Sequence, residues 1–552
     1  MKIFKKKGIL IILAALLFCS GAFYGFNRDE KNFEISKNLN IYHTLFRELN
    51  MFYVDEIDSG DLIKKSMDAM LLSLDPYTTY IPESEIEDFK LMTTGEYAGI
   101  GSLISKHGDD IIVAEPYKDL PADKAGLKAG DVFVEINGIK INKKKTSDVS
   151  NLLKGQVNMP LTIKVRRPGV NKLIVKEVVR ADIQLKSVPY YGMLEDSIGY
   201  INLNQFTNKA SGEVRNALRE LKEEKAKSII LDLRGNPGGL LDQAVDIVNL
   251  FVEKGENIVS TKGKVSQWDK SYIADKVPLD TEIPIAILVS RGSASASEIV
   301  SGAIQDLDRG IVVGQRTFGK GLVQTTRNLS YNSKLKVTTA KYYIPSGRCI
   351  QALDYSHRNE DGSVGKVPDT LTSEFKTKNG RKVRDGGGIL PDVKVEMDLF
   401  SSLSVGLIRK YKVFDFATQY ANKHAEIADA TSFELSDQDY EDFKQFLKAE
   451  KFEYKSEGTE ILEALKKAAK EEKYFEIAQE EFDNISAKLT PNLDRDMKVF
   501  EKEIKTLIAH EIVKRYHYQI GGIKYALRDD KVLKEAMTAL KDQKKYKEIL
   551  KR

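Results

Sequence analysis

Hydrophobic and polar positions along the 552 residues follow several different patterns. Residues 8–26 form an apolar run without a charge, and residues 32–89 space their apolar side chains at near-helical intervals. Residues 95–183 alternate short β-rich runs with turns, whereas residues beyond 392 are rich in Lys and Glu with the apolar stripes of amphipathic helices. Between these stretches, short apolar runs are followed by glycine-rich turns. The chain is too long for one core, so we expect several domains.

The amino terminus has the pattern of a membrane segment. Lys2 and Lys5 to Lys7 precede the apolar run. At ~1.5 Å per residue, a helix of its nineteen residues reaches about 28 Å, close to the roughly 30 Å core of a bilayer. Positive charge on the leading side is expected to place the rest of the chain outside the cytoplasm. We expect a single-pass anchor within residues 1–29, with secretion after cleavage at Ser20-Gly-Ala22 as the alternative.

Composition excludes some classes of function. The 85 basic and 81 acidic residues nearly balance, which argues against a nucleic-acid-binding surface. The sequence has no His-Glu-x-x-His run and no Cys-x-x-Cys pair, so we expect no metal and no other cofactor. Cys19 lies in the apolar run and Cys349 is the other cysteine, so no intrachain disulfide is expected in an exported part.

A serine and a lysine lie in glycine-flanked turns that suit nucleophilic catalysis. Residues 284–290 have the pattern of a buried strand and residues 297–307 that of a helix, which places Ser295 at the turn between them. Lys320 follows after enough residues for a helix, a short strand and a turn. A serine hydroxyl needs a neighbouring base, and a lysine is one only when uncharged. Working at neutral pH requires lowering an ordinary lysine pKa of ~10.4 by roughly 3 units, or about 4 kcal/mol, which desolvation can supply.

A second strand-end turn offers backbone donors for an oxyanion. Residues 228–233 form a short apolar run, followed by Arg234-Gly-Asn-Pro-Gly-Gly239 and a helical pattern. Such a turn leaves backbone N–H groups without side-chain cover. The N–H of Ala296, at the start of a helix, is a further donor. These turns each follow a strand, and open sheets bind ligands beyond the carboxyl ends of their strands.

Plainer interpretations compete at each position. Ser295-Ala-Ser-Glu298 also fits a helix capping box, and a lysine among glycines is commonly just solvated. A Ser-His-Asp triad is the weaker catalytic alternative, because none of the six histidines lies in a glycine-rich motif at a strand end. The histidines are His43, His107, His357, His424, His510 and His517.

The combined motifs resemble the carboxyl-terminal processing proteases, also called tail-specific proteases, which are serine peptidases with a Ser-Lys dyad. The resemblance covers about residues 40–400. It rests on Leu74-Asp-Pro76, Tyr97-Ala-Gly-Ile-Gly101, Asp232-Leu-Arg-Gly-Asn-Pro-Gly-Gly239, Ser293-Ala-Ser-Ala-Ser-Glu-Ile299, Thr317-Phe-Gly-Lys-Gly-Leu-Val-Gln324, Thr339-Ala-Lys-Tyr-Tyr-Ile-Pro-Ser-Gly-Arg348 and Gly388-Ile-Leu-Pro-Asp392.

The resemblance implies a role for each motif. Ser295 would be the nucleophile and Lys320 the general base, with Gln324, one helical or loop turn beyond the lysine, orienting the base. The oxyanion donors would be the amides of Ala296 and of Gly238 or Gly239. Asp306 matches a position implicated in some members, but an aspartate late in a helix is expected to be structural.

Residues 121–138 resemble part of a PDZ domain, with Pro121-Ala-Asp-Lys-Ala-Gly-Leu-Lys-Ala-Gly-Asp131 followed by Val132-Phe-Val-Glu-Ile-Asn-Gly138. In such a domain a peptide adds as a strand to a sheet edge, and its carboxylate is received by backbone amides. The receiving loop would be formed by Ala98, Gly99, Ile100 and Gly101. The domain could present substrate, block the active site or bind a separate partner.

We therefore expect a multidomain α+β and α/β protein with a crotonase-like protease core. The predicted parts are a signal anchor (1–29), a helical segment (30–92), a PDZ domain (93–186), the serine protease core (187–400) and a helical carboxyl-terminal region (401–552). Helix interruptions are expected at Asp75-Pro76, Pro491 and Gly521-Gly522. The last region is expected to be an ordinary bundle or a module for oligomerisation or adaptor docking.

The predicted function is extracytoplasmic serine endopeptidase activity on protein substrates with exposed apolar carboxyl-terminal tails. The resemblance implies a bacterial inner membrane location with the catalytic part facing the periplasm. Expected partners are these substrates, the membrane, an adaptor and a second copy of the chain, but not nucleic acid. The alternatives are a non-catalytic PDZ scaffold and a protease active only with an adaptor.

Overall fold

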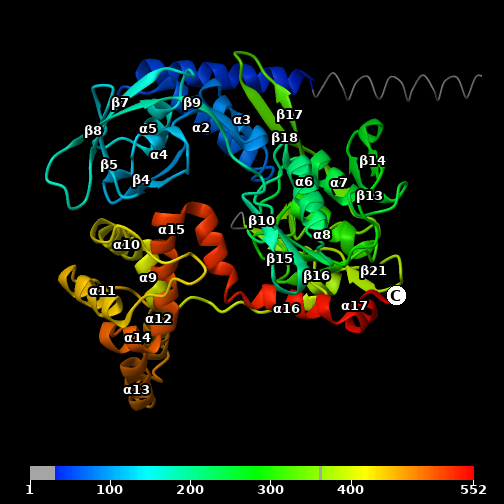
Figure 1. The fold of residues 1–552 in the computed structure, drawn as a ribbon. Coiled ribbons are helices and arrows are strands. Elements are labelled where there is room, and N and C mark those ends of the chain that lie inside the picture. Colours follow the sequence, from blue (N-terminus) through cyan, green and yellow to red (C-terminus); the bar gives the residue numbers. More distant parts are fainter. Residues whose placement is uncertain (1–31, 360–362) are drawn as a thin grey trace, which may run out of the picture. The chain divides into compact units, whose positions relative to one another are not determined.

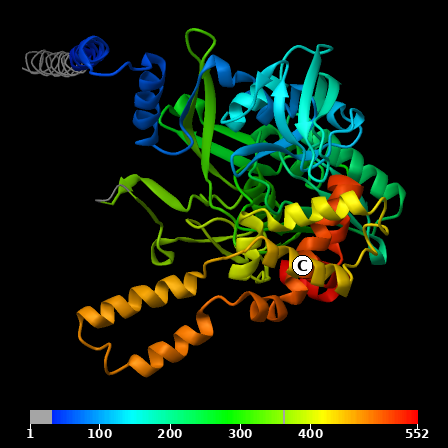
Figure 2. The ribbon, with the colours of Figure 1, turned by 90° about the vertical axis from the view of Figure 1, so that its left-hand side faces the viewer.

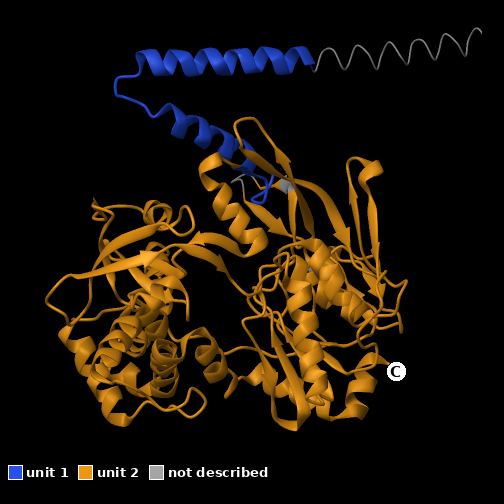
Figure 3. Ribbon diagram, turned by 45° about the horizontal axis from the view of Figure 1, so that its top comes forward, with its two compact units in different colours: residues 1–80 blue, residues 81–552 orange. Residues whose placement is uncertain are grey.

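The computed structural model describes residues 32–359 and 363–552. The apolar run 8–26, and with it the predicted anchor, lies outside the described residues. No helix within the described ranges is long and apolar enough to cross a bilayer. The chain divides into two compact units, residues 1–80 and residues 81–552 (Figure 3).

The described part of the first unit is mainly helical, as the apolar spacing predicts. Residues 32–52 are helical, and α2 (Ser59–Leu72) follows after a short connection. Asp58 caps α2 by accepting the N–H of Asp61 at 3.0 Å. The predicted interruption at Asp75-Pro76 is confirmed, because the Asp75 carboxylate accepts the N–H groups of Tyr77 and Thr78 at 2.8 Å in a turn.

A six-stranded, largely parallel sheet lies at the centre of the second unit (Figure 1). Its order is β10 (Tyr190–Met193), β11 (Ile198–Asn202), β12 (Ser228–Asp232), β15 (Ile285–Val289), β16 (Ile311–Gly314) and β23 (Val393–Lys394), with only β10 antiparallel to its neighbour. Every residue of β12, β15 and β16 is buried. This burial explains their continuous apolar runs, because a parallel sheet is covered on both faces.

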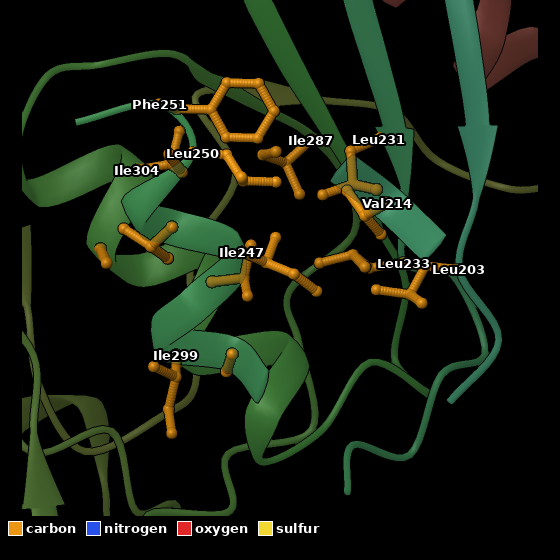
Figure 4. Packing of buried hydrophobic residues seen from close by; sticks show 14 of the residues in the cluster. Leu203, Val214, Leu231, Leu233, Ile247, Leu250, Phe251, Ile287, Ile299 and Ile304 are labelled. Carbon is orange, nitrogen blue, oxygen red and sulfur yellow. The ribbon is translucent and has the colours of Figure 1, made fainter. Parts of the chain in front are cut away.

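Helices from the middle of the chain cover one face of this sheet. They are α6 (Ala210–Glu223), α7 (Leu241–Asn249) and α8 (Ala296–Asp306). Figure 4 shows Leu231 and Ile287 from the strands beside Ile247 and Ile304 from the helices. This cluster is the core on which α8, the helix after Ser295, is mounted.

Helices from the end of the chain cover the opposite face. They are α16 (Lys531–Lys541) and α17 (Gln543–Leu550), whose Leu533, Leu540 and Leu550 share a buried cluster with Ile230 and Leu288 of the strands. The Tyr546 hydroxyl also bonds to the backbone of Ile285 in β15. The sequence predicted one helical region from residue 401 to the end, but its last two helices complete the core of the central sheet.

The remaining β elements of the second unit form smaller sheets. β17 (Leu322–Asn328) pairs with β18 (Lys334–Tyr343), which pairs with β13 (Asn257–Gly263), and β13 pairs with β14 (Lys270–Ile273). Two short hairpins follow, β19 (Leu353–Arg358) with β20 (Val364–Lys366) and β21 (Glu374–Lys376) with β22 (Lys382–Arg384).

A separate antiparallel sheet corresponds to the predicted PDZ domain. Its order is β3 (Ser102–His107), β4 (Asp110–Pro116), β5 (Val132–Ile136), β7 (Pro160–Arg166) and β8 (Ile174–Val179), with β6 (Ile139–Lys140) beside β5. The short helices α4 (Pro121–Lys124) and α5 (Thr146–Leu153) complete it, and β2 (Glu96–Gly99) pairs with β9 (Ala181–Gln184). Its core is independent, and β3 lies at the edge of the sheet.

A helical bundle follows the central sheet and has its own core. Its helices are α9 (Ser402–Arg409), α10 (Lys412–Lys423), α11 (Asp437–Ala449), α12 (Glu457–Glu471), α13 (Gln479–Leu489), α14 (Leu493–Val499) and α15 (Glu501–Leu527). Figure 2 shows α12 and α13 as a pair of orange helices extending from the bundle. The predicted class, with helical regions flanking a PDZ domain and a mixed protease core, is confirmed.

One predicted helix interruption is confirmed in this bundle and one is wrong. Pro491 lies between α13 and α14, as predicted. Gly521 and Gly522 instead lie inside α15, and the break is at Tyr518, with φ 54° and ψ −160°. Glycine is needed there for close packing, because a Cβ on Gly521 would collide with the His517 side chain.

Leu540→Ala tests the contribution of α16 to the sheet. Leu540 is 2% exposed, so truncation should leave a cavity under the strands and lower the free energy of unfolding of this core by about 2 to 5 kcal/mol. The measurement is hydrogen exchange of β15 and β16, because a multidomain chain has no single unfolding transition. The exposed Lys544→Ala in α17 is the control. Equal protection of both strands in Leu540→Ala and the parent chain would contradict this packing role.

Candidate active site

Ser295 lies in a strained turn between β15 and α8. Its φ of 56° and ψ of −113° are outside the regions that a residue with a Cβ ordinarily adopts. Helix α8 begins at the next residue, Ala296, one residue before the start that the sequence predicted. Strain of this kind persists only where surrounding contacts hold it, and it is common at functional turns.

The buried carboxylate of Glu298 holds the serine turn and the lysine turn together. Its Oε2 accepts the N–H of Ser295 at 2.8 Å and the N–H of Lys320 at 2.9 Å. Its Oε1 accepts the N–H of Gly319 at 2.7 Å and the hydroxyl of Thr317 at 2.6 Å. One side chain therefore binds the backbone on both sides of the predicted Ser-Lys pair.

Burial raises the pKa of Glu298 to about 7, and the four donors oppose this rise. All four neighbours donate, so only the ionised carboxylate can accept from each of them. The sequence identified Glu298 as half of a capping box, and its bond to the Ser295 N–H is formed. The contacts to the lysine turn were missed, because spacing within one helix does not reveal what a buried side chain meets elsewhere.

Gly238 packs directly against the serine turn. It has φ +100°, and a Cβ there would lie 2.7 Å from the Ala294 oxygen, 2.8 Å from the Ser295 Cβ and 2.9 Å from the Ala296 nitrogen. Only glycine allows this approach. The structure thus brings the predicted oxyanion turn beside the Ala296 amide.

Hydrogen bonds distinguish the two candidate glycines. The N–H of Gly238 donates to the Asn236 Oδ1 at 2.9 Å, whereas the Gly238 carbonyl accepts the N–H of Phe206 at 3.0 Å. Leu240 donates back to the Phe206 carbonyl at 2.8 Å. Within the described residues, no acceptor of the chain takes the N–H of Gly239. The geometry therefore favours Gly239 as the donor and Gly238 as the residue that permits close contact.

Asn236 fixes this loop to the serine turn. It is fully buried, and its Nδ2 donates to the Leu203 carbonyl at 2.7 Å. Its own carbonyl accepts the N–H of Ala294 at 3.0 Å and the hydroxyl of Ser297 at 2.9 Å. The sequence showed no role for Asn236 beyond its place in a glycine-rich turn.

Charged residues anchor the start of the same loop. Arg234 bonds to Asp232 at the end of β12, and also pairs with Asp530 at 2.6 Å. Asp530 in turn caps α16 by accepting the N–H of Leu533 at 2.9 Å. Asp232 also accepts the Tyr200 hydroxyl at 2.8 Å. Arg234 and Asp530, which are nearly 300 positions apart in the chain, thus hold one end of the loop. No sequence pattern predicted this ion pair.

Lys320 lies in a turn, as predicted, but Gln324 does not. Gly319 before the lysine has φ +88°, and the N–H of Gly321 after it donates to the Gln351 Oε1 at 2.7 Å. Gln324 was expected one helical or loop turn beyond the lysine. It lies instead in strand β17, where its Nε2 donates to the Thr338 hydroxyl of β18 at 3.1 Å.

Asp306 has a structural position at the end of α8. It is 1% exposed and forms a buried ion pair with Arg348 at 2.8 Å, while its other oxygen accepts the N–H of Ser346 at 3.1 Å. These contacts agree with the structural interpretation of this residue. Among the described residues, no cluster of His, Cys, Asp and Glu could hold a metal ion.

The predicted carboxylate loop joins β2 to β3 at the edge of the PDZ sheet. Ala98 and Gly99 belong to β2, while Ile100 and Gly101 form the turn. The Ile100 carbonyl accepts the N–H of Ala122 at 2.8 Å. Gly101 has φ +71°, and its carbonyl accepts the N–H of Tyr117 at 3.0 Å. The loop carbonyls are thus bound within the domain, next to the edge strand β3.

Family comparisons cover the three main parts of the second unit. The family described as "Peptidase family S41" matches residues 197–357, and "PDZ domain" matches residues 112–167. "Probable PDZ-protease, C-terminal helical domain" matches residues 403–540.

Individual proteins are similar over much of their length. The "Carboxy-terminal-processing protease" of Bartonella bacilliformis is 37% identical over 347 residues, which are 62% of this chain and 79% of that protein. A "Probable CtpA-like serine protease" of Staphylococcus aureus is 36% identical over 343 residues, 62% of this chain and 67% of the relative. A solved "Photosystem II D1 C-terminal processing protease" is 27% identical with a TM-score of 0.35, covering 64% of this chain and 91% of that one.

Glu298→Gln tests whether the shared carboxylate positions both turns. An amide would turn an NH₂ group toward two of the four donors, so we expect the serine and lysine turns to separate and kcat to fall by about 100-fold. The measurement is steady-state hydrolysis. Glu213→Gln is the control, because Glu213 is a half-buried glutamate that also accepts a backbone N–H, that of Val188 at 2.8 Å, but belongs to α6. Equal activity of the two variants would remove Glu298 from this role.

The same variant has a second readout in the pH dependence of stability. The folded-state pKa of about 7 lies above the ordinary 4.5, so the folded chain retains a proton that the unfolded chain has released between these values. The contribution of Glu298 to the free energy of unfolding is fully present below about pH 4.5. It decreases as the pH rises toward about 7, and the total loss is about 3 kcal/mol. Glu298→Gln should lack this contribution when the two unfolding free energies are compared across that window.

Proposed function

The chain belongs to peptidase family S41, the carboxyl-terminal processing proteases, and we propose that Ser295 and Lys320 form its catalytic dyad. The protein is a serine endopeptidase. Membership in this family favours the peptidase over the non-catalytic PDZ scaffold. The observation that carries the dyad is the Glu298 carboxylate, which binds the backbone N–H of both residues.

The proposed reaction forms and then hydrolyses an acyl-enzyme. The uncharged Nζ of Lys320 takes the proton of the Ser295 hydroxyl as its oxygen attacks the scissile carbonyl. The tetrahedral oxyanion accepts hydrogen bonds from the amides of Ala296 and Gly239, and the lysine returns the proton to the leaving amine. Water then attacks the ester with Lys320 again as base, which releases the second product and restores the serine. We also propose that Gln324, which lies in strand β17, orients the side chain of Lys320.

We propose that substrates are proteins with exposed apolar carboxyl-terminal tails. The PDZ domain provides the edge strand β3, on which a peptide can add as a strand, and the loop Ala98–Gly101 beside it. The relatives are named for carboxy-terminal processing, which agrees with tail recognition. Adaptor control and pairing of two copies remain proposals that the protease family suggests.

The location and domain limits are also proposals. Lys2 and the apolar run 8–26 support an anchored, extracytoplasmic enzyme in a bacterial inner membrane, with cleavage and release to the periplasm as the alternative. We propose the limits 1–29, 30–92, 93–186, 187–400 and 401–552 for the anchor, helical segment, PDZ domain, protease core and bundle. Residues 531–550 of the last part serve the protease core through α16 and α17.

Ser295→Ala and Lys320→Arg test the dyad. Both variants should lose turnover of an unfolded protein with an apolar tail by at least about 1,000-fold, because arginine keeps the charge but cannot act as a base in this range. The measurement is appearance of cleavage products by gel and mass spectrometry, with binding of the tail as a control for folding. Near-parental activity of Lys320→Arg would refute lysine as the base.

Gly238→Ala tests the oxyanion turn. The added Cβ would overlap the Ser295 Cβ and the Ala296 nitrogen, so we expect kcat to fall by about 100-fold or more with little change in tail binding. Gly235→Ala is the matched control, because Gly235 in the same loop also has a positive φ, +69°, but has open space around a Cβ. Equal losses in both variants would attribute the effect to backbone strain rather than to contact with the serine turn.

A further inference from the structure

Tyr342 is a buried tyrosine that bonds to both the serine turn and the lysine turn. It belongs to β18 and is 1% exposed. Its hydroxyl donates to the carbonyl of Ser295 at 3.3 Å, and its backbone N–H donates to the carbonyl of Gly321 at 2.9 Å. Gly321 directly follows Lys320. Tyr342 therefore binds the backbone of both turns, as Glu298 does, but from a strand rather than from α8.

Among the described residues, three groups donate to the Ser295 carbonyl. The N–H groups of Glu298 and Ile299 reach it at 2.8 Å and 2.9 Å, as the first bonds of α8. The Tyr342 hydroxyl is the third donor, and its bond is longer because a carbonyl oxygen has only two lone pairs. This bond is the one that ties the carbonyl to β18. The helix donors move with α8, whereas the phenol is fixed by a different element.

The Ser295 carbonyl shares a peptide group with the Ala296 N–H. A trans peptide is planar and its C=O and N–H point in opposite directions, so a contact that fixes the carbonyl also fixes the N–H. The Ala296 N–H is the first amide of α8 and has no acceptor within the helix. The Ser295 ψ of −113° sets the direction of this peptide, in a turn whose φ of 56° is strained. Such a turn requires outside contacts to keep its geometry.

We propose that Tyr342 is a positioning residue for the oxyanion hole, because its hydroxyl holds the Ser295–Ala296 peptide with the Ala296 N–H directed at the oxyanion. This inference rests on the proposed dyad and its oxyanion donors. Tyr342 acts through the peptide group and does not touch the substrate. Oxyanion donors stabilise the transition state when they are aligned before the reaction begins. Loss of the hydroxyl should therefore affect turnover and not the binding of the tail.

Tyr342→Phe removes the hydroxyl and keeps the ring in the core. The Ser295 carbonyl retains its two helix donors, so no buried group loses its only partner and the variant should fold. We expect kcat to fall about tenfold with KM unchanged, which is less than the roughly 100- to 1,000-fold loss on removing an oxyanion donor. The pH at half-maximal kcat should stay the same, because the backbone bond to Gly321 is retained. The measurement is steady-state hydrolysis of a fluorogenic peptide with an apolar tail across pH.

Tyr440→Phe is the matched control. Tyr440 is also 1% exposed, and its hydroxyl donates to a backbone carbonyl, that of Met497 at 2.6 Å, but it lies in α11 of the bundle. We expect it to leave kcat unchanged. Equal losses in the two variants would overturn the inference, because they would follow from the loss of any buried hydroxyl. A shifted pH dependence in Tyr342→Phe would also overturn it, because the hydroxyl would then act on the base.

A peptide boronic acid separates the oxyanion from ordinary binding. Its boron forms a tetrahedral adduct with the Ser295 oxygen, and one boron-bound oxygen takes the place of the oxyanion. We expect Tyr342→Phe to weaken binding of acetyl-Val-Val-boroalanine about tenfold, in step with kcat. In the Ser295→Ala background, a labelled free-acid peptide ending in Val-Val-Ala should bind equally with and without Tyr342→Phe. Unchanged boronate affinity beside a reduced kcat would contradict the inference.

Failure of the proposed function has a different signature. If hydrolysis survives in Ser295→Ala, the proposed nucleophile is wrong, and the role of Tyr342 is wrong with it. If Ser295→Ala is inactive but Tyr342→Phe keeps the parental kcat and boronate affinity, the dyad stands and only the role of Tyr342 is wrong.

Discussion

The proposed catalytic site depends on one buried carboxylate that two distant turns share. Glu298 is fully buried and accepts hydrogen bonds from the serine turn and from the lysine turn. Burying an ionised group is unfavourable unless its acceptors are satisfied, and here four donors converge on two oxygens. Burial still raises the pKa of Glu298 to about 7, although the four hydrogen bonds lower it. Because the carboxylate is stable only with its donors in place, it couples the position of Ser295 to that of Lys320.

The third element of the site is held by packing rather than by charge. Gly238 fits between the Ser295 Cβ and the Ala296 nitrogen, and Asn236 bonds the loop to the start of α8. The other end of the loop is anchored by Arg234, which pairs with Asp530 just before α16. Helices α16 and α17 also bury the second face of the sheet. The carboxyl-terminal helices are therefore part of the support of the site, although the bundle before them has a separate core.

The sequence by itself determined the local features of this protein. The turn at Ser295 follows from a buried strand run and a helical pattern on either side of it, and the family from motifs such as Asp232-Leu-Arg-Gly-Asn-Pro-Gly-Gly239. These are short-range properties, because strand runs, caps and glycine turns depend on neighbouring residues. Gln324 marks a limit of that reasoning, since the pairing of β17 with β18 decided that it lies in a strand.

Only the tertiary structure decided which distant groups meet. Glu298 looked like a helix cap, and its contacts with Gly319 and Lys320 exist because the chain returns to α8 after β16. The break in α15 lies at Tyr518 rather than at the glycines. Gly521 lies inside the helix, where close packing against His517 requires glycine. Arg234 and Asp530 meet through the burial of α16 on the sheet. Burial and pairing depend on residues that are far apart in the chain, so a pattern of neighbouring residues cannot predict them.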